Sequence, residues 1–161
     1  MLVAGCELRG QTGHDAGRQL LAELYRDYTG NDLPEIAVSP RGKPYFSDGK
    51  LHFSISHTKG HAFCVLAERP VGLDAEELER KIDLRLAEKI LSPAEYAQFL
   101  AAEDRSRALL TFWVLKEAAA KATGEGLRGY PKNTNFTLSD PRVFVRDGCV
   151  LAIIQEEKDA V

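Results

Sequence analysis

The sequence predicts an α+β fold in which helices pack on a mainly antiparallel sheet. Three observations favour it: short apolar strands open the chain, helices with clear start signals occupy its middle, and the last forty residues are β-rich again. A length of 161 residues indicates a single domain, 1–161. Apolar residues make up 44% and charged residues 28%, as is usual for a globular protein.

The first elements are a short apolar strand at 2–8 and a helix at 13–28. Thr12 can cap this helix, apolar side chains recur along it at helical spacing, and Gly30 ends it. Turn chemistry follows at 41–46 and again at 47–50. Three strands are then predicted at 51–56, 61–67 and 71–76.

The middle of the chain carries helix start signals. Asp83 can cap a helix over 84–91, and Ser92-Pro93-Ala94-Glu95 combines an N-cap, a proline in the first turn and a capping glutamate. The best helix runs over 106–123 and ends at Gly124. Further strands are predicted at 136–138, 143–145 and 150–154, with Asp147-Gly148 as a hairpin turn. The amino-acid sequence shows no internal repeat.

Charge and cysteine usage limit the partners and the compartment. The net charge is -3, so no basic excess indicates nucleic acid or an anionic membrane as the main partner. Three cysteines far apart form neither a disulfide framework nor a zinc knuckle, which favours a reducing, cytoplasmic location. The first residues make a poor signal peptide, and no apolar run reaches the roughly 20 residues of a membrane span.

One helix face carries chemistry-bearing side chains. Trp113, Glu117 and Lys121 are four residues apart and fall within an arc of about 80°. They are equally typical of an amphipathic helix with an aromatic core anchor and a surface ion pair. Upstream, Asp74 and Glu76 lie on the same side of a strand, where two carboxylates suit a hard divalent ion such as Mg²⁺. A solvated acidic turn is the alternative.

A strand that ends in Ser54-Ile55-Ser56-His57-Thr58 is suited to phosphate oxygens, and Lys43 in a Gly-Lys-Pro turn adds a cation. Serines and threonines at a strand end also cap turns, so a purely structural role stays open. A Ser/His hydrolase is disfavoured, since no G-x-S-x-G elbow and no third catalytic member is evident.

Four motifs in order resemble the 4′-phosphopantetheinyl transferases, in particular the Sfp-type branch, over about residues 42–138. They are Gly42-Lys43-Pro44, Phe53-Ser54-Ile55-Ser56-His57, Val71-Gly72-Leu73-Asp74-Ala75-Glu76, and Trp113-Val114-Leu115-Lys116-Glu117-Ala118-Ala119-Ala120-Lys121 with Gly124-Glu125-Gly126-Leu127. The resemblance implies a pseudo-two-fold arrangement of two α+β halves, with a shortened first half at 1–70 and a second half with the metal motifs at 71–161.

The family resemblance also implies a reaction. It transfers the 4′-phosphopantetheine arm of coenzyme A to a serine of an apo acyl or peptidyl carrier protein and releases 3′,5′-ADP. Mg²⁺, or alternatively Mn²⁺, would be held by Asp74, Glu76 and Glu117. Glu117 and Lys121 would be catalytic, with Glu117 as candidate general base. Coenzyme A would contact Lys43, Pro44, Ser56, His57 and Lys121.

The front of the chain departs from the family pattern, because only 42 residues precede Lys43. Basic residues that the first half usually supplies to coenzyme A have no clear counterparts, and His14, Arg18 and Arg41 are the candidates. The pseudo-dimer plan of the family favours a monomer. Basic residues between 78 and 107, Arg80 among them, either steer an acidic carrier or belong to solvated helix faces.

Two other functions compete with the transferase. The chain is either a non-catalytic module that binds a carrier or a nucleotide, or a Mg²⁺-dependent hydrolase of nucleotide pyrophosphates. The intact catalytic motifs favour the transferase over both.

Overall fold

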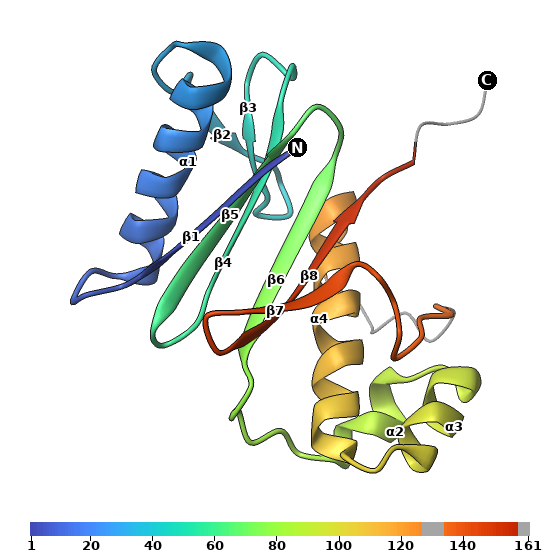
Figure 1. Cartoon of the computed structure of the whole chain (residues 1–161). Helices are drawn as coiled ribbons and strands as arrows, with labels where there is room; N and C mark the ends of the chain where they lie inside the picture. Colours follow the sequence, from blue (N-terminus) through green and yellow to red (C-terminus); the bar gives the residue numbers. More distant parts are fainter. Residues whose placement is uncertain (127–133, 158–161) are drawn as a thin grey trace.

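The structure is a computed structural model that describes residues 1–126 and 134–157 (Figure 1). Helices pack on strands that pair only antiparallel in this part of the chain, so the α+β prediction is confirmed. The elements are β1 (Leu2–Glu7), α1 (Gly13–Thr29), β2 (Ile36–Val38), β3 (Pro44–Phe46), β4 (His52–His57), β5 (His61–Ala67), β6 (Val71–Glu77), α2 (Leu86–Ile90), α3 (Pro93–Ala101), α4 (Arg105–Thr123), β7 (Val143–Arg146) and β8 (Cys149–Gln155).

Two units of the fold share one topology. The first unit consists of β1, α1, β4 and β5, with strand order β1-β5-β4, and the second consists of β6, α4, β7 and β8, with strand order β6-β8-β7. In both, a strand and a helix precede a hairpin whose second strand becomes the centre of the sheet. The expected pseudo-two-fold arrangement is therefore present, although the letters of the sequence show no repeat.

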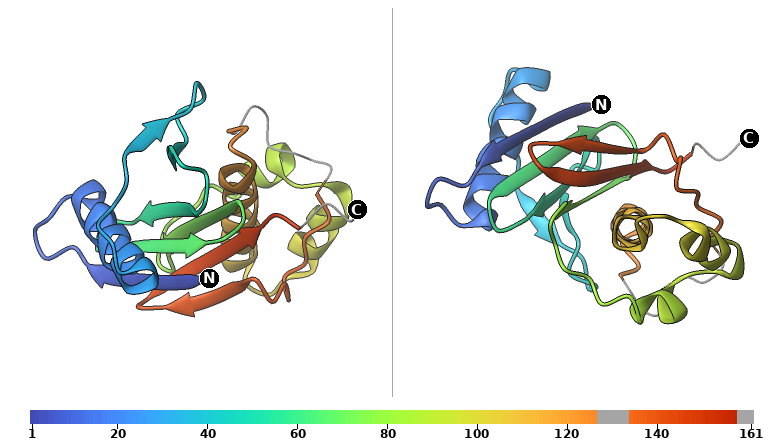
Figure 2. Two further views of the ribbon diagram at one scale, coloured as in Figure 1. Left: turned by 90° about the horizontal axis from the view of Figure 1, so that it is seen from above. Right: turned by 60° about the horizontal axis from the view of Figure 1, so that its bottom comes forward.

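The two sheets form the inner layers and the two long helices the outer layers (Figure 2). In the central strand β5, Ala62, Cys64 and Leu66 face α1, whereas Phe63 and Val65 face the second sheet. Strand β8 divides its side chains in the same way between α4 and the first sheet. Both strands are therefore covered on two faces, which explains their nearly continuous apolar sequences.

Most helix ends agree with the local signals. The side chain of Thr12 accepts a hydrogen bond from the Asp15 amide at 3.1 Å, and Ser92 forms the predicted capping box with Glu95. Gly30 and Gly124 adopt left-handed conformations at the ends of α1 and α4, with φ of 74° and 70°. These signals act within a few residues, so the sequence is sufficient to predict them.

Two local predictions were wrong, and a third was incomplete. Asp83 does not cap a helix over 84–91, because Arg85 binds its carboxylate and α2 begins only at Leu86. Residues 136–138 form no strand, since side chains of α3 take up their backbone groups: the Phe136 amide donates to Glu95 and the Leu138 amide to Gln98, each at 3.1 Å. The segment at 41–46 contains more than turns, because β3 pairs with β2.

A close backbone contact places α4 on its sheet. A Cβ atom added to Gly72 of β6 would lie 1.9 Å from the Ala118 carbonyl oxygen and 2.5 Å from the Ala122 amide nitrogen. Only glycine on the strand lets the small-residue face of α4 come this near. The approach sets the helix directly over β6, so the acidic residues that follow Gly72 lie beneath the α4 side chains.

Serine side chains join the two sheets. The hydroxyl of Ser54 in β4 accepts a hydrogen bond from the Leu73 amide of β6 at 3.0 Å, and Ser56 accepts one from the Ala75 amide at 3.1 Å. Both serines are buried. They satisfy backbone donors of β6 that no neighbouring strand reaches on this side, and they fix β4 against β6.

Candidate active site

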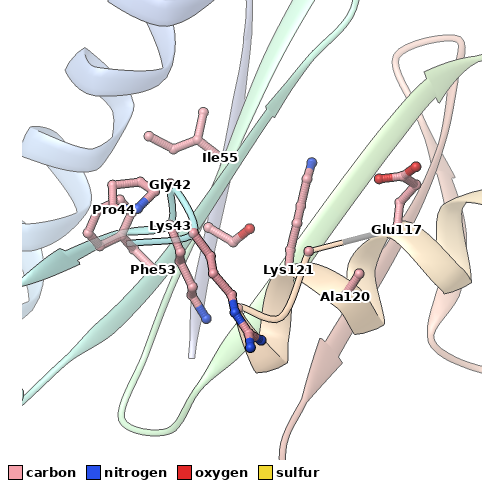
Figure 3. A pocket seen from close by; sticks show the side chains of 12 residues that line it. Gly42, Lys43, Pro44, Phe53, Ile55, Glu117, Ala120 and Lys121 are labelled. Carbon is pink, nitrogen blue, oxygen red and sulfur yellow. The ribbon is translucent and has the colours of Figure 1, made fainter. Parts of the chain in front are cut away.

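A pocket of about 310 Å³ lies between the first unit and α4 (Figure 3). The turn before β3 supplies Arg41, Lys43 and Pro44 on one side, and Glu117 and Lys121 project from α4 on the other. The structure thus brings together residues that are far apart in the sequence. Its described lining is completed by Gly42, Phe53, Ser54, Ile55, Ala120, Gly124 and Gly126.

Asp74 lies next to this pocket and is almost fully buried. Lys121 Nζ is 2.8 Å from Asp74 Oδ1 and also donates to the Leu73 carbonyl at 3.1 Å. The Ser56 hydroxyl is 3.3 Å from the same Oδ1. Burial nevertheless raises the pKa of Asp74, against the effect of the Lys121 ammonium. The second oxygen, Oδ2, has no hydrogen-bond partner in the part of the chain that the structure describes.

Glu76 follows on the same side of β6, as the strand alternation predicts. Its Oε1 accepts a hydrogen bond from Trp113 Nε1 at 3.2 Å and forms an ion pair with Arg80. The Arg80 guanidinium also lies over the Trp113 ring, 5.4 Å from the centroid. Burial raises the pKa of Glu76, opposed by Arg80. Trp113 and Lys121 thus both reach β6, which confirms that they share a helix face.

Glu117 of α4 lies near enough to both carboxylates to be affected by their charge. Burial, together with the negative charges of Asp74 and Glu76, raises its pKa to about 7. Lys121 is four residues away but pairs with Asp74, so the simple surface pair within the helix does not form. A half-buried carboxyl that titrates near neutrality is suited to exchange a proton with a bound group.

The acidic residues fit a hard divalent cation in their chemistry. No group of three His, Cys, Asp or Glu side chains among residues 1–126 and 134–157 is arranged to hold a metal ion as it stands. Asp74 Oδ2, however, is a buried carboxylate oxygen without a partner among the described residues, and burial together with acidic neighbours favours the protonated form of Glu117. Oxygen ligands and unrelieved negative charge are what Mg²⁺ binds.

Lys43 connects the two sides of the pocket. Its Nζ donates to the Ala122 carbonyl near the end of α4 at 2.6 Å, and its alkyl chain approaches Gly124. Partial burial lowers the pKa of Lys43. The lysine therefore also has a structural role, because it binds a carbonyl oxygen at the negative end of the helix.

The other predicted ligands lie around the first unit. Ser56 is turned toward β6, and its hydroxyl is used by Ala75 and Asp74. His57 is exposed at the end of β4, so close to the start of α1 that a Cβ on Gly13 would lie 2.3 Å from its Cγ. His14 is exposed in the first turn of α1, and Arg18 is partly buried further along the same helix. Leu127, from the last motif, lies outside the described residues.

Sequence reasoning missed two features near the site. The pairing of Arg80 with Glu76 had a weak signal in the four-residue spacing of the two. The second feature is a fully buried ion pair between Lys116 and Glu95, 2.8 Å apart, with side chains 1% and 0% exposed. Thr134 bridges it, because it accepts a hydrogen bond from Lys116 and donates one to Glu95, both at 2.6 Å. Lys116 thereby fixes α4 one residue before Glu117.

Comparisons with known proteins agree with this geometry. A family described as the 4′-phosphopantetheinyl transferase superfamily matches residues 70–150, half of the chain. The 4′-phosphopantetheinyl transferase HetI of a Nostoc species is 33% identical over 122 residues, which cover 70% of this chain and 52% of the relative. The enzyme gsp of Aneurinibacillus migulanus is 34% identical, with coverages of 70% and 51%.

The chain spans about half the length of the curated relatives it matches. AcpT of Salmonella typhi is 36% identical over 68% of this chain and 57% of its own. No helix among the described residues is long and apolar enough to cross a membrane. Three of the four motifs line one pocket, and Asp74 of the remaining one contacts Lys121 beside it. This geometry, the family match and the relatives lead to one conclusion: the chain belongs to the 4′-phosphopantetheinyl transferase superfamily.

Proposed function

We propose that the chain transfers the 4′-phosphopantetheine arm of coenzyme A to a serine hydroxyl of an apo acyl or peptidyl carrier protein. The observation that supports this most is the pocket in which the Gly-Lys-Pro turn meets Glu117 and Lys121 of α4, beside Asp74. Residues 1–70 and 71–161 act in this proposal as two halves of one domain, and the substrate lies between them.

Coenzyme A enters with its nucleotide end at the first half. Lys43 and Arg41 line that side of the pocket and offer two cations to phosphate groups. His57, His14 and Arg18 lie around the junction of β4 and α1 and provide further donors to the 3′-phosphate end. Pro44 packs at the pocket wall beside Lys43. Ser56 contributes indirectly in this proposal, because its hydroxyl already forms a hydrogen bond with Asp74.

The pyrophosphate then lies near the acidic residues of the second half. Asp74, Glu76 and Glu117 would hold Mg²⁺, which neutralises charge on the pyrophosphate and on the leaving nucleotide. Lys121, anchored by Asp74 and the Leu73 carbonyl, directs its ammonium toward the reacting phosphate. A partly buried cation in this position stabilises the negative charge of the transition state.

The transfer forms one bond and breaks one. The serine oxygen of the carrier bonds to the phosphorus next to the pantetheine arm, and the bond from that phosphorus to the bridging oxygen breaks. The released group is 3′,5′-ADP. Glu117 accepts the serine proton directly or through a water, which suits a carboxyl whose pKa lies near 7.

Mass spectrometry of apo-carriers incubated with the chain, coenzyme A and MgCl₂ tests the proposal. A carrier should gain one phosphopantetheine group, and Asp74→Ala and Glu117→Ala should each lower the rate by about 10²-fold or more. Glu79→Ala, an exposed position in the same acidic segment, is the matched control and should label like the wild type. Equal labelling by all variants contradicts the mechanism. ADP release without carrier would instead indicate the hydrolase, and carrier binding without labelling the non-catalytic module.

A further inference from the structure

Two of the three acidic residues of the site are already neutralised by cations of the chain. Lys121 pairs with Asp74, and Arg80 pairs with Glu76, whereas Glu117 makes no ion pair with the described residues. Lys121 borders the pocket and has a role in the transfer. Arg80 does not border that pocket, so the proposed reaction leaves its position next to Glu76 unexplained.

The side chains of Glu76, Trp113 and Arg80 all contact one another. Glu76 Oε1 receives both the Trp113 indole N–H, at 3.2 Å, and the Arg80 guanidinium, which in turn stacks on the Trp113 ring 5.4 Å from the centroid. The Arg80 side chain is 39% exposed and that of Glu76 is 21% exposed. One carboxylate oxygen is therefore occupied by two donors, and one of them is a full positive charge.

A divalent cation bound to Glu76 would repel the Arg80 guanidinium, because the two positive charges would lie at the same carboxylate oxygen. The guanidinium has room to leave, since Arg80 and Glu76 both line a cleft of about 580 Å³. The other described residues of its lining are all polar or charged: Thr58, Lys59, Glu77, Glu79 and Lys81. Its glutamates offer a displaced guanidinium new partners.

We propose that Arg80 is a counter-cation built into the chain: it neutralises Glu76 in the metal-free protein, and a divalent cation displaces it from Glu76 toward the other glutamates of the same cleft. Trp113 is the platform that holds the guanidinium until then. This inference rests on the proposed metal-holding role of Glu76. It makes Arg80 a residue that weakens metal binding and limits acidic repulsion while the site is empty.

Metal titration in the absence of coenzyme A and carrier tests the inference. Free Mn²⁺ is measured by electron paramagnetic resonance during titration with MnCl₂, and MgCl₂ is added as a competitor. Arg80→Gln should bind the metal about two- to tenfold more tightly than the wild type, because a competing ion pair is gone. Lys81→Gln removes the same charge from the next, exposed residue and should change the affinity much less.

Fluorescence supplies a second readout, because Trp113 is the single tryptophan of the chain. Metal addition should change its emission in the wild type as the guanidinium leaves the ring, and Arg80→Gln should remove most of this change. Equal Mn²⁺ affinities for Arg80→Gln and Lys81→Gln, weaker binding by Arg80→Gln, or no binding by any variant would overturn the inference.

Failure of the proposed function gives a different pattern. In that case the carriers stay unlabelled while the titrations behave as expected, because metal binding here requires neither substrate. If the carriers are labelled but Arg80→Gln leaves the Mn²⁺ affinity unchanged, the transferase stands and the role of Arg80 is wrong.

Discussion

The two units of this protein have the same topology but bring helix and sheet together in different ways. In the first unit the glycine at the contact is on the helix: a Cβ on Gly17 of α1 would lie 2.4 Å from the Ile55 side chain of β4. In the second unit the glycine is on the strand, and Gly72 of β6 faces the backbone of α4 itself. A side chain can move aside, but a helix backbone cannot.

This difference accounts for where the chemistry lies. Backbone-to-backbone approach in the second unit fixes α4 at one height over β6, so Lys121 meets Asp74 and Trp113 meets Glu76. The first unit instead lines the pocket with Phe53, Ser54 and Ile55. In the proposed function, the unit with the backbone contact thus carries the residues whose geometry the reaction would require.

The largest effect is expected at the two glycines. Gly72→Ala places a methyl group against the Ala118 carbonyl and should lower the free energy of unfolding by more than about 4 kcal/mol and abolish labelling. Gly17→Ala meets the Cγ2 methyl group of Ile55 rather than backbone and gains about 1 kcal/mol of helix propensity, so its net loss should be about 1–2 kcal/mol. Urea unfolding measures both, and similar losses at the two positions would show that the approaches are equally tight.

The buried ion pair is expected to have the next largest effect. Lys116→Met leaves the Glu95 carboxylate buried without its cation, and should cost about 3 kcal/mol in urea unfolding. Combining it with Glu95→Gln should recover part of the loss, because no buried charge is then left unpaired. Two ion pairs lie within residues 1–67, and the side chains of both are exposed. Arg26→Gln breaks one of them, so it is the matched control and should change the free energy of unfolding by less than about 1 kcal/mol. If Lys116→Met alone is as stable as Arg26→Gln, the buried ion pair does not contribute more than an exposed one.

The serines that join the sheets allow a finer test. Ser54→Ala and Ser56→Ala each leave one β6 amide without its acceptor, so each should lower the free energy of unfolding by about 1–2 kcal/mol. Ser56 in addition touches Asp74, at 3.3 Å, and Ser54 does not. Mn²⁺ affinity should therefore fall further in Ser56→Ala than in Ser54→Ala. Equal affinities in the two variants would show that Ser56 acts only as a structural join.

The smallest effect concerns Glu117 and pH. Its pKa is about 7 in the folded chain, above its ordinary value of 4.5, so the folded state holds the proton more tightly than the unfolded state. Stability contributed by this group is present below pH 4.5 and is lost as the pH rises to about 7. Glu117→Gln should therefore stabilise the metal-free protein at pH 8 by about 1 kcal/mol, since solvent screens a half-exposed group.

Thermal or urea unfolding with a chelator present measures this gain, and the difference between variant and wild type should shrink at pH 4.5. Glu23→Gln on the exposed face of α1 supplies the control, without such a pH-dependent difference. A gain that is the same at both pH values would mean that the charge of Glu117 is not the cause.

Local signals in the sequence were sufficient where the interaction is local. Ser92 and Glu95 cap α3 within four residues, and Gly124 ends α4 by its own conformation. The same reasoning failed where another group, near or far along the chain, competes for a side chain or a backbone group. Arg85 took the carboxylate of Asp83, and α3 side chains satisfied the backbone around Phe136, which the composition alone predicts to be a strand.

The candidate site divides in the same way. Two carboxylates on one side of a strand and three side chains on one helix face follow from the periods of strand and helix, so the sequence indicated both sets. Their partners could not be predicted, because each pairing bridges many residues. Ser56 is 18 positions from Asp74, and Lys43 is 79 from Ala122.

By itself the sequence determined which groups are available: the acidic pair of β6, the α4 face, the Gly-Lys-Pro turn and the family to which they point. Only the tertiary structure decided what each group contacts. Gly72 lets α4 pack close against β6. In this close packing Lys121 pairs with Asp74 and not with Glu117. Periodicity sets the direction of a side chain within its own element, whereas the distance between elements depends on the packing of all of them.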